Sequence, residues 1–570
     1  MSPTARDPHL PAVHPRPPKN WINDPNGLCF HDGHYHVFHQ YNPHGPEHSG
    51  VHWGHMRSTD LVSWQSLPVA LTPTPGGEDA DGCFSGNAVS HKGRLIAFYS
   101  AYRKDRWHQP IAAAESRDGG LTWAKRPGLL IPDPPPGTTM YRDPYVWRHD
   151  GGWRMLVGAG LTGDRGAALL YESPDLESWR YLGPFFAADD GHLPGTGGWT
   201  GWECPQYATF GDRGALIVSL WDAADGPSSV RAYVGSEHEG TFQPAAHHLL
   251  DHGPDFYAPA LLHAPAGPSD PEVEGGGRWL LWGWSWEARD SEWTAQAGWA
   301  GVLTLPREIS LSNDGRVHQQ PARELLLQRR SQLVRATGRS ATTDATGLGS
   351  VGRTFDLTAR LRPEAGDTAR LRLTTADDGT EYLDITVDIT ARHLAVDRNR
   401  GSRDPRARRG RYTMPLDGAA GTDGAVEMRV VVDASIVEVF LPTGQAMTVR
   451  WYPTAEPPWR LQFLGNGHYT VDAWELGPQV SQGNPDSSGA RTGSTIAADL
   501  LSACPPTAAA VPPNHAGAPA SPPCGLLVRA ACPTGRSRPR GVPSDSEAAP
   551  AWSVPAEATK RCPGRRRRPR

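Results

Sequence analysis

Ser58-Thr59-Asp60-Leu61-Val62-Ser63-Trp64 is the stretch that decides the fold, because the chain repeats it in altered form. It returns as Ser116-Arg117-Asp118-Gly119-Gly120-Leu121-Thr122-Trp123, then as Ser173-Pro174-Asp175-Leu176-Glu177-Ser178-Trp179, and more faintly from Ser236-Glu237 to Thr241-Phe242. The starts of these copies lie 58, 57 and 63 residues apart. Each copy joins a turn-forming Ser/Asp cluster to an aromatic residue that can pack on the next strand. A fixed period of this size is typical of repeated structural units.

Three carboxylates follow nearly the same period. Asp24 lies in Trp21-Ile22-Asn23-Asp24-Pro25-Asn26-Gly27, Asp143 in Tyr141-Arg142-Asp143-Pro144, and Glu203 in Trp202-Glu203-Cys204-Pro205. Their separations are 119 and 60 residues, so the acids recur at about sixty or twice sixty, and the missing position falls at Phe84-Ser85-Gly86. Each unit is therefore expected to present the same part of itself to a shared point.

The units are expected to be small β-sheets. Short alternating runs such as 34–38 and 94–99 are typical of strands. Four-stranded blades of about this length around a central channel make a β-propeller. A β-sandwich with accidental Ser-Asp-Trp similarities is the alternative, and it is less consistent because two separate residue sets share one period.

The composition limits the kinds of binding partner that we expect. The chain has 570 residues, 21 Trp, 63 Gly and a formal net charge of −5, which gives no broad basic field for nucleic acid. No run approaches the length of a membrane span, and residues 1–20 lack a hydrophobic stretch. We therefore expect a cytoplasmic protein without nucleic-acid or membrane partners; a start upstream of Met1 would instead make it secreted. The oligomeric state stays open.

Metal and cofactor sites are not expected. No C-x-x-C pair occurs. His34 and His36 would share one face of a strand and His31 and His39 the other, so the four cannot converge on one metal. For Cys204, a small buried residue beside the site is favoured over a direct chemical role.

The pattern changes along the chain. Runs such as Tyr382–Val387 and Val426–Val432 alternate between Asp/Gly turns, which indicates a second domain, a β-sandwich. The final segment is rich in Pro, Ala, Ser and Gly and cannot bury enough apolar surface to offset its chain entropy. The expected parts are an N-terminal leader (1–20), the catalytic propeller (21–310), a polar linker (311–335), the sandwich (336–478) and a disordered tail (479–570).

Carboxylates converging at a channel mouth indicate glycosidase chemistry. Two carboxyl groups about 5–5.5 Å apart across a glycosidic oxygen give a retaining enzyme, in which one acid attacks the anomeric carbon and the other moves the proton. A lone Asp24 would be read as a solvated turn residue. The set, with Asn23, Arg142 and Trp202 adjacent, favours catalysis.

Over residues 20 to about 477 the sequence resembles glycoside hydrolase family 32, the β-fructofuranosidases that include invertases, levanases and inulinases. The motifs that carry the resemblance are 21–27, Gln40-Tyr41-Asn42-Pro43, Trp53-Gly54-His55, Phe84-Ser85-Gly86, 141–144, 202–205, Asp255-Phe256-Tyr257-Ala258, and Val432-Asp433 through Glu438-Val439-Phe440. The resemblance implies a five-bladed β-propeller followed by a β-sandwich.

It also implies roles for individual residues. Asp24 would be the nucleophile, Glu203 the general acid/base and Asp143 the stabiliser of the transition state. The implied fructosyl-binding residues are Asn23, Gln40, Trp53, Phe84, Ser85, Arg142, Tyr257 and one of Trp282, Trp284 or Trp286, of which Trp284 is our choice.

The expected activity is release of fructose from terminal β-D-fructofuranosides, most simply sucrose or short fructans, without a cofactor. Hydrolysis of sucrose 6-phosphate, exo-levanase or exo-inulinase action, and fructosyl transfer are alternatives. If a phosphate is recognised, Arg103 and Arg106 are the expected contacts. A fructan-binding propeller without turnover is the alternative from another class, and the intact acids argue against it.

Overall fold

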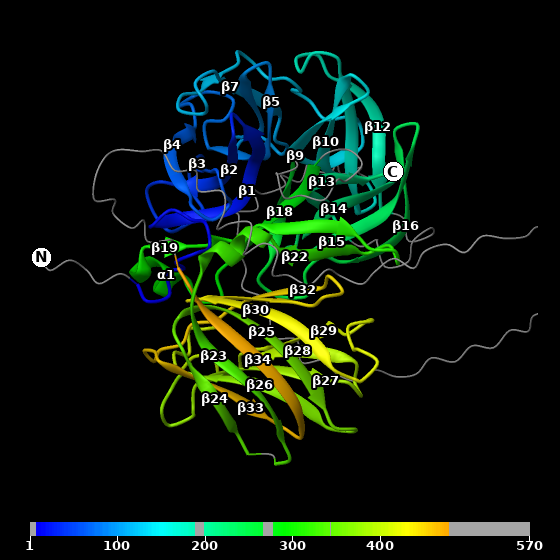
Figure 1. Ribbon diagram of the computed structural model, residues 1–570. Helices are drawn as coiled ribbons and strands as arrows, with labels where there is room; N and C mark the ends of the chain where they lie inside the picture. The colour runs from blue at the N-terminus through cyan, green and yellow to red at the C-terminus, as the bar shows by residue number, and fades with distance from the viewer. Residues whose placement is uncertain (1–6, 189–198, 266–276, 343, 478–570) are drawn as a thin grey trace, which may run out of the picture.

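The computed structural model describes residues 7–188, 199–265, 277–342 and 344–477. The expected tail, 479–570, lies outside the described residues. The described chain is all-β, as predicted, with a short helix α1 (Ser291–Ala297) and a 3-10 helix η1 (Arg323–Gln328). None of its helices is long and apolar enough to cross a membrane. Figure 1 shows two lobes, one formed by β1 to β22 and the other by β23 to β34.

The first lobe consists of five sheets among the described residues. Their strands are β1 (Asn20–His31), β2 (His34–Asn42), β3 (His52–Ser58), β4 (Gln65–Leu71) and β19 (Trp299–Ala300); β5 (Gly82–His91), β6 (Arg94–Tyr102), β7 (Ile111–Ser116) and β8 (Ala124–Lys125); β9 (Thr138–His149), β10 (Gly152–Leu161), β11 (Arg165–Ser173) and β12 (Arg180–Ala187); β13 (Gly201–Phe210), β14 (Arg213–Asp222), β15 (Gly226–His238) and β16 (Thr241–Leu249); and β17 (Tyr257–Pro265), β18 (Gly277–Ser285), β20 (Val302–Leu303), β21 (Arg307–Leu311) and β22 (Val317–Pro321).

The first strands of these sheets form a closed ring. They contact one another in the order β1, β5, β9, β13 and β17, and β17 contacts β1. The late strand β19 pairs in parallel with β1, so residues 299–300 join the first sheet. Because the ring is closed, the inner strand of each sheet is an edge protected by the neighbouring inner strands, and the five strands surround one axis. The arrangement is the β-propeller that the period predicted.

The repeated Ser-Asp-aromatic sequence packs each sheet on the one before it. Asp60 accepts hydrogen bonds from Ser58 and from the backbone that follows, which makes the turn between β3 and β4. The aromatic residue at the end of each copy then contacts the preceding sheet; the pairs are Trp123 with Phe38, Trp179 with Phe98, Phe242 with Phe185 and, across the ring closure, Trp64 with Trp282. The repeat thus determines both the turn and the contact between sheets.

The second lobe is a β-sandwich of two six-stranded sheets. One contains β23 (Arg329–Ser340), β25 (Thr354–Pro363), β30 (Val426–Asp433), β31 (Ile436–Phe440), β32 (Ala446–Arg450) and β34 (Gly467–Leu476); the other contains β24 (Thr346–Val351), β26 (Thr368–Thr374), β27 (Tyr382–Asp388), β28 (His393–Asp397), β29 (Arg411–Pro415) and β33 (Trp459–Leu464). Alternate residues of both sheets, such as Leu357 and Leu371, meet in one apolar core.

Two expected boundaries differ in the structure. Segment 311–335, expected as a linker, contains β22, η1 and the start of β23, because its apolar residues Val317, Leu325 and Leu326 are buried. The described part of the expected leader, residues 7–20, is also packed into the protein. The backbone N–H groups of Ala12, Val13 and His14 donate to the buried carboxylate of Asp433 in the sandwich.

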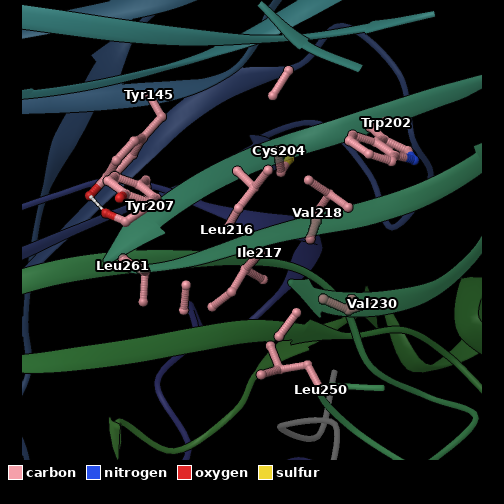
Figure 2. Close-up of a cluster of buried hydrophobic side chains, with 14 of the residues drawn as sticks. Tyr145, Trp202, Cys204, Tyr207, Leu216, Ile217, Val218, Val230, Leu250 and Leu261 are labelled. Atoms are coloured by element: carbon pink, nitrogen blue, oxygen red, sulfur yellow. Dashed lines mark hydrogen bonds between the residues drawn. The ribbon is translucent and has the colours of Figure 1, made fainter. Parts of the chain in front are cut away.

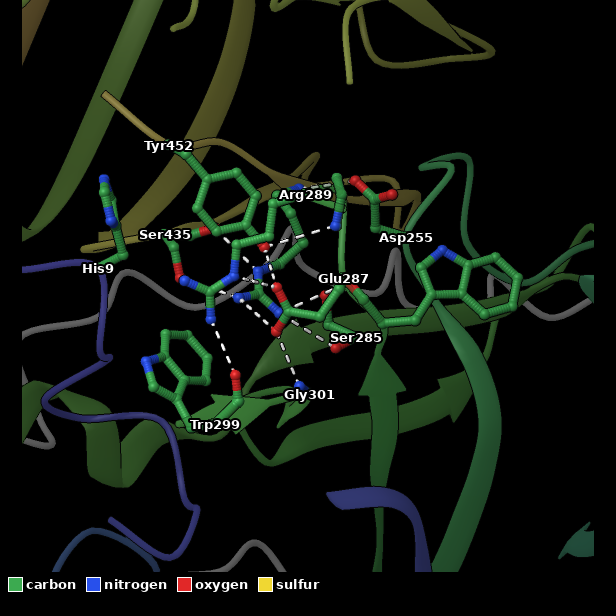
Figure 3. A network of polar contacts seen from close by, with 12 residues as sticks. His9, Asp255, Ser285, Glu287, Arg289, Trp299, Gly301, Ser435 and Tyr452 are labelled. Carbon is green, nitrogen blue, oxygen red and sulfur yellow. Dashed lines mark hydrogen bonds and ion pairs between the residues drawn. The ribbon is translucent and has the colours of Figure 1, made fainter. Parts of the chain in front are cut away.

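Charged residues fill the interface between the lobes. Figure 3 shows Glu287 and Arg289 of the propeller lobe beside Ser435 and Tyr452 of the sandwich. Glu287 receives hydrogen bonds from Arg289 at 2.9 Å and from the Tyr452 hydroxyl at 2.5 Å. His14 lies between Asp433 and Glu438, with each contact 2.9 Å long. Because these groups are buried, the interface has specific partners rather than a sliding apolar surface.

Candidate active site

Each of the five inner strands carries a β-bulge at a matching place. The pairing register shifts between Ile22 and Pro25 in β1, between Phe84 and Gly86 in β5, between Arg142 and Tyr145 in β9, between Glu203 and Gln206 in β13, and between Tyr257 and Ala260 in β17. A bulge turns the side chains beside it out of the usual alternation. Two consecutive residues of each strand can therefore face the propeller axis.

The local sequence explains the bulges. In four strands a proline stands in the bulge or directly after it, namely Pro25, Pro144, Pro205 or Pro259, and proline lacks the N–H that a regular ladder would use. In β5 that residue is Gly86, whose Cβ would lie 2.0 Å from the carbonyl oxygen of Phe98. Asp143, Cys204 and Ala258 have φ of 66°, 46° and 44°, a strained conformation that proteins concentrate at functional sites.

The bulges align Cys204, and not Glu203, with Asp143, because Arg142 and Glu203 are the last paired residues before their bulges. In β1 the last paired residue is Ile22, so Asn23 and Asp24 both lie in the bulge. The spacing of about sixty residues therefore aligns Glu203 with Asp143 only to within one residue. The spacing between blades varies by a few residues and hides this offset. The recurring X-Pro dipeptides at 24–25, 143–144, 204–205 and 258–259 carry the correct alignment.

Asp24 is held by a short chain of polar side chains. Ser85 Oγ donates to Asp24 Oδ2 at 2.5 Å, and Asn23 Nδ2 donates to Asp24 Oδ1 at 3.2 Å. Gln40 connects the two, because it donates to Ser85 and accepts from Asn23 at 2.9 Å. Burial raises the pKa of Asp24 to about 6; the charge of Glu203 adds to this rise and the hydrogen bonds oppose it.

Asp143 and Cys204 lie next to Asp24. The backbone N–H of Cys204 donates to Asp143 Oδ2 at 3.0 Å, while Cys204 Sγ lies 3.6 Å from that oxygen and 3.7 Å from Asp24 Oδ2. Burial, with the charges of Glu203 and Asp24, raises the pKa of Asp143. Burial also raises the pKa of the Cys204 thiol, so the sulfur remains protonated and is a weak donor between two carboxylates.

The side chain of Cys204 was expected only to pack, and its contacts with both acids were missed. Figure 2 shows it on β13 beside Trp202 and the apolar residues Leu216 and Val218 of β14. Cys204 is therefore anchored by the core on one side and faces the acids on the other.

Glu203 has a different set of neighbours. Its Oε1 lies 3.1 Å from Arg142 Nε, and its Oε2 lies 2.8 Å from the Tyr257 hydroxyl, which is also 3.0 Å from the carbonyl oxygen of Leu220. A phenol has one hydrogen. The Tyr257 hydroxyl can therefore donate to Glu203 or to the carbonyl of Leu220, but not to both at once. Glu203 is thus held by Arg142 and Tyr257, whereas Asp24 is held by Ser85 and Asn23.

The expected aromatic residues occupy two sides of the site. Phe84 stacks on Tyr102 with centroids 4.3 Å apart, and Trp53, which is fully buried, supports it by donating to its carbonyl at 3.0 Å. On the other side, Trp284 is 8% exposed, and Trp286 is more accessible. The Trp286 ring stacks on Tyr257 with centroids 5.4 Å apart. Trp286 is therefore a better candidate for a sugar contact than Trp284 or the buried Trp282.

Two family models match most of the chain. Residues 14–321 match the N-terminal domain of glycosyl hydrolases family 32, and residues 324–475 match the C-terminal domain of the same family.

Curated proteins and solved structures agree with this match. A probable sucrose-6-phosphate hydrolase from Psychromonas ingrahamii is 31% identical over 80% of this chain and 79% of its own. A levanase from Bacillus subtilis is 31% identical over 82% and 70%. The fold is similar to that of fructan 1-exohydrolase IIa from Cichorium intybus (TM-score 0.71, 23% identity, 83% of this chain and 98% of that one) and of a Bombyx mori β-fructofuranosidase variant in complex with sucrose (TM-score 0.67, 24% identity, 82% and 94%).

Proposed function

Because the chain belongs to glycoside hydrolase family 32, we propose that it hydrolyses terminal β-D-fructofuranosides with retention, through a covalent fructosyl-enzyme. The protein is a glycosidase of the β-fructofuranosidase type, and its substrate contains fructose. One observation carries the proposed mechanism: the propeller axis brings Asp24, Asp143 and Glu203 together, each with different partners. The finer architecture that we propose is five blades, one for each sheet of the first lobe.

In the first step, the Asp24 carboxylate attacks the anomeric carbon of the fructosyl unit. The bond to the leaving oxygen breaks, and Glu203 gives that oxygen its proton. In the second step, Glu203 takes a proton from water, the water oxygen attacks the same carbon, and Asp24 leaves as a carboxylate. The hydrogen bonds from Ser85 and Asn23 favour the ionised form of Asp24 that this attack requires.

Asp143 is proposed to hold fructosyl hydroxyls. A carboxyl group fixed by the N–H of Cys204 can accept from a sugar hydroxyl, and this bond strengthens as positive charge develops on the sugar ring. Burial and the nearby charges of Glu203 and Asp24 raise the pKa of Asp143, so its ionised form is disfavoured in the free site. A hydroxyl of the bound sugar would supply a hydrogen-bond donor to this ionised form.

Sucrose or a short fructan is the proposed substrate. Several relatives are named sucrose-6-phosphate hydrolases, others levanase and raffinose invertase. The arginines considered for a phosphate each have an acidic partner here: Arg103 pairs with Asp105, and Arg106 with Glu78. This pairing favours an uncharged leaving group over a phosphorylated one.

The first experiment compares sucrose, sucrose 6-phosphate, inulin and levan at equal fructosyl concentration and measures free fructose. Asp24→Ala should lower turnover by several powers of ten, each of which corresponds to about 1.4 kcal/mol of barrier. Asp32→Ala is the matched control, because Asp32 lies in the turn after the same strand and its side chain is 81% exposed. Near-normal fructose release by Asp24→Ala would contradict the assignment of the nucleophile.

Glu203→Gln tests the proton donor. It should slow sucrose hydrolysis by roughly 10²- to 10⁴-fold, the usual loss for general acid catalysis. A fructoside with an acidic leaving group, such as a nitrophenyl fructoside, should be slowed less because its departure needs no proton. Equal slowing of both substrates would exclude Glu203 as the proton donor.

A further inference from the structure

The sandwich lobe reaches the active site through one buried carboxylate, Asp255. Arg398, which follows β28, donates through Nη1 to Asp255 Oδ2, and the backbone N–H of Arg450 on β32 donates to the same oxygen at 2.7 Å. Asp255 and Arg398 are buried, with side chains 0% and 2% exposed. In Figure 3 Asp255 lies at one side of the interface network that contains Glu287 and Arg289.

Arg398 is itself fixed within the sandwich. Its Nη1 donates to the carbonyl oxygen of Arg450 at 2.7 Å, and its Nη2 donates to the Tyr412 hydroxyl at 3.0 Å. A buried ion pair is weak evidence for stability, because desolvation of both charges offsets their attraction. What such a pair does provide is a defined position for each partner.

The position of Asp255 is passed on to the site. Tyr257 follows two residues later at the start of β17, and its hydroxyl contacts Glu203. Trp286 holds the same segment from the other side, because its Nε1 donates to the carbonyl oxygen of Pro254 at 2.8 Å and its ring stacks on Tyr257. Segment 254–257 is therefore clamped between the propeller and the sandwich, with Tyr257 directed at Glu203.

We propose that Arg398 is a positioning residue for the acid/base step: through Asp255 it sets the place of Tyr257 and, through Tyr257, that of Glu203. This inference rests on the proposed role of Glu203 as the acid/base. The sandwich lobe would then have an indirect part in catalysis, because Arg398 acts through Asp255 and Tyr257 rather than by contact with Glu203. The consequence is that a change in the sandwich should impair proton donation specifically.

The test is a double-mutant cycle of Arg398→Lys and Tyr257→Phe in the full chain. Each single variant should slow sucrose hydrolysis by about 10- to 100-fold, the range for losing a hydrogen bond to a charged group. The double variant should be no slower than Tyr257→Phe alone, because both changes interrupt one path. Both variants should slow a nitrophenyl fructoside less than sucrose, because the departure of the nitrophenyl group needs no proton from Glu203.

Asp356→Asn is the matched control. Asp356 is a fully buried sandwich carboxylate that, like Asp255, pairs with arginine, here Arg329 and Arg429, but it lies outside segment 254–257 and its partners. This variant should lose thermal stability without the difference between the two substrates. If Arg398→Lys does not fold, Tyr412→Phe takes its place in the cycle under the same criteria; it removes the hydrogen bond from Arg398 to the hydroxyl and the one from the hydroxyl to the carbonyl oxygen of Arg409.

The outcomes separate the two proposals. The positioning role of Arg398 would be overturned if the rate losses of the two single variants multiply in the double variant, or if sucrose and the nitrophenyl fructoside are slowed equally. The proposed function would still stand in that case, provided that the wild-type enzyme releases fructose. A wild-type protein that releases no fructose from any of the substrates would overturn the proposed function and this inference together.

Discussion

His14→Ala should destabilise the protein although His14 is not one of the proposed active-site residues. The His14 side chain is fully buried between Asp433 and Glu438. Removing one partner of a buried ion pair costs about 3–5 kcal/mol. The lower value, about 3 kcal/mol, applies here because Asp433 keeps its backbone donors and Glu438 keeps Arg307. At about 2 °C per kcal/mol, the lower end for large domains, the unfolding midpoint should fall by about 6 °C.

The loss should depend on pH. Burial disfavours charge on His14, but the hydrogen bonds and charges of Asp433 and Glu438 outweigh burial and raise its pKa above the usual 6.5. A raised pKa gives stability that is complete below 6.5 and disappears as the pH rises through the folded value. Burial raises the pKa of both acids, but their partners outweigh it and lower both values. His14 is the main partner for Asp433, and Arg307 is the main partner for Glu438. Their contribution is present above the unfolded values and disappears as the pH falls through the folded ones.

Differential scanning fluorimetry at several pH values would measure this. The gap between wild type and His14→Ala should be widest between pH 4.5, the ordinary value for Glu438, and pH 6.5, and should narrow on the alkaline side. His9→Ala is the control, because His9 lies on the same segment but has one carboxylate partner, Asp7. The unfolding midpoint of His9→Ala should fall less than that of His14→Ala. An unchanged midpoint for His14→Ala, or a gap that widens as the pH rises above neutrality, would refute the reasoning.

Two further predictions concern the neighbours of the acids. Ser85→Ala removes the donor that opposes the raised pKa of Asp24, so this pKa should rise above about 6 and the acid limb of the kcat/KM profile should move to higher pH by about one unit; an unmoved limb would count against Asp24 as the ionised nucleophile. Cys204→Ala should keep activity within about tenfold, because the backbone N–H still donates to Asp143. Cys204→Val should be far less active, since a β-branched residue is strained at φ 46°; equal activity of these two variants would contradict this account.

The sequence was sufficient to predict the parts of the fold that repeat. The Ser-Asp-aromatic copies recur because each must make the same turn and contact the preceding sheet, as Trp123 and Trp179 do. The convergence of Asp24, Asp143 and Glu203 could be expected for the same reason, because each lies on the inner strand of its own sheet. A periodic physical constraint leaves a periodic trace in the sequence.

Contacts between distant segments leave no such trace. His14 and Asp433 are 419 residues apart, and Asp255 and Arg398 are 143 apart. A segment rich in Pro, His and Arg looks like a leader until its partner carboxylates are known. The segment expected as a linker was misjudged similarly, because Val317 packs in the propeller core and Leu325 packs with Val431 and Leu476 of the sandwich, which local polarity does not reveal.

The bulges make the chemistry of the site depend on register. Successive residues of a regular strand face opposite sides, so without the bulges Asn23 and Asp24, or Glu203 and Cys204, could not both reach the site. Loss of a bulge would turn either a proposed catalytic carboxylate or one of its partners away from the other acids. A proline in or beside the bulge excludes a regular hydrogen bond at that place, and in β5 only glycine fits at position 86, because a Cβ there would lie 2.0 Å from the carbonyl oxygen of Phe98. The backbone features that look least regular in the propeller are therefore the ones that keep each functional side chain at its place.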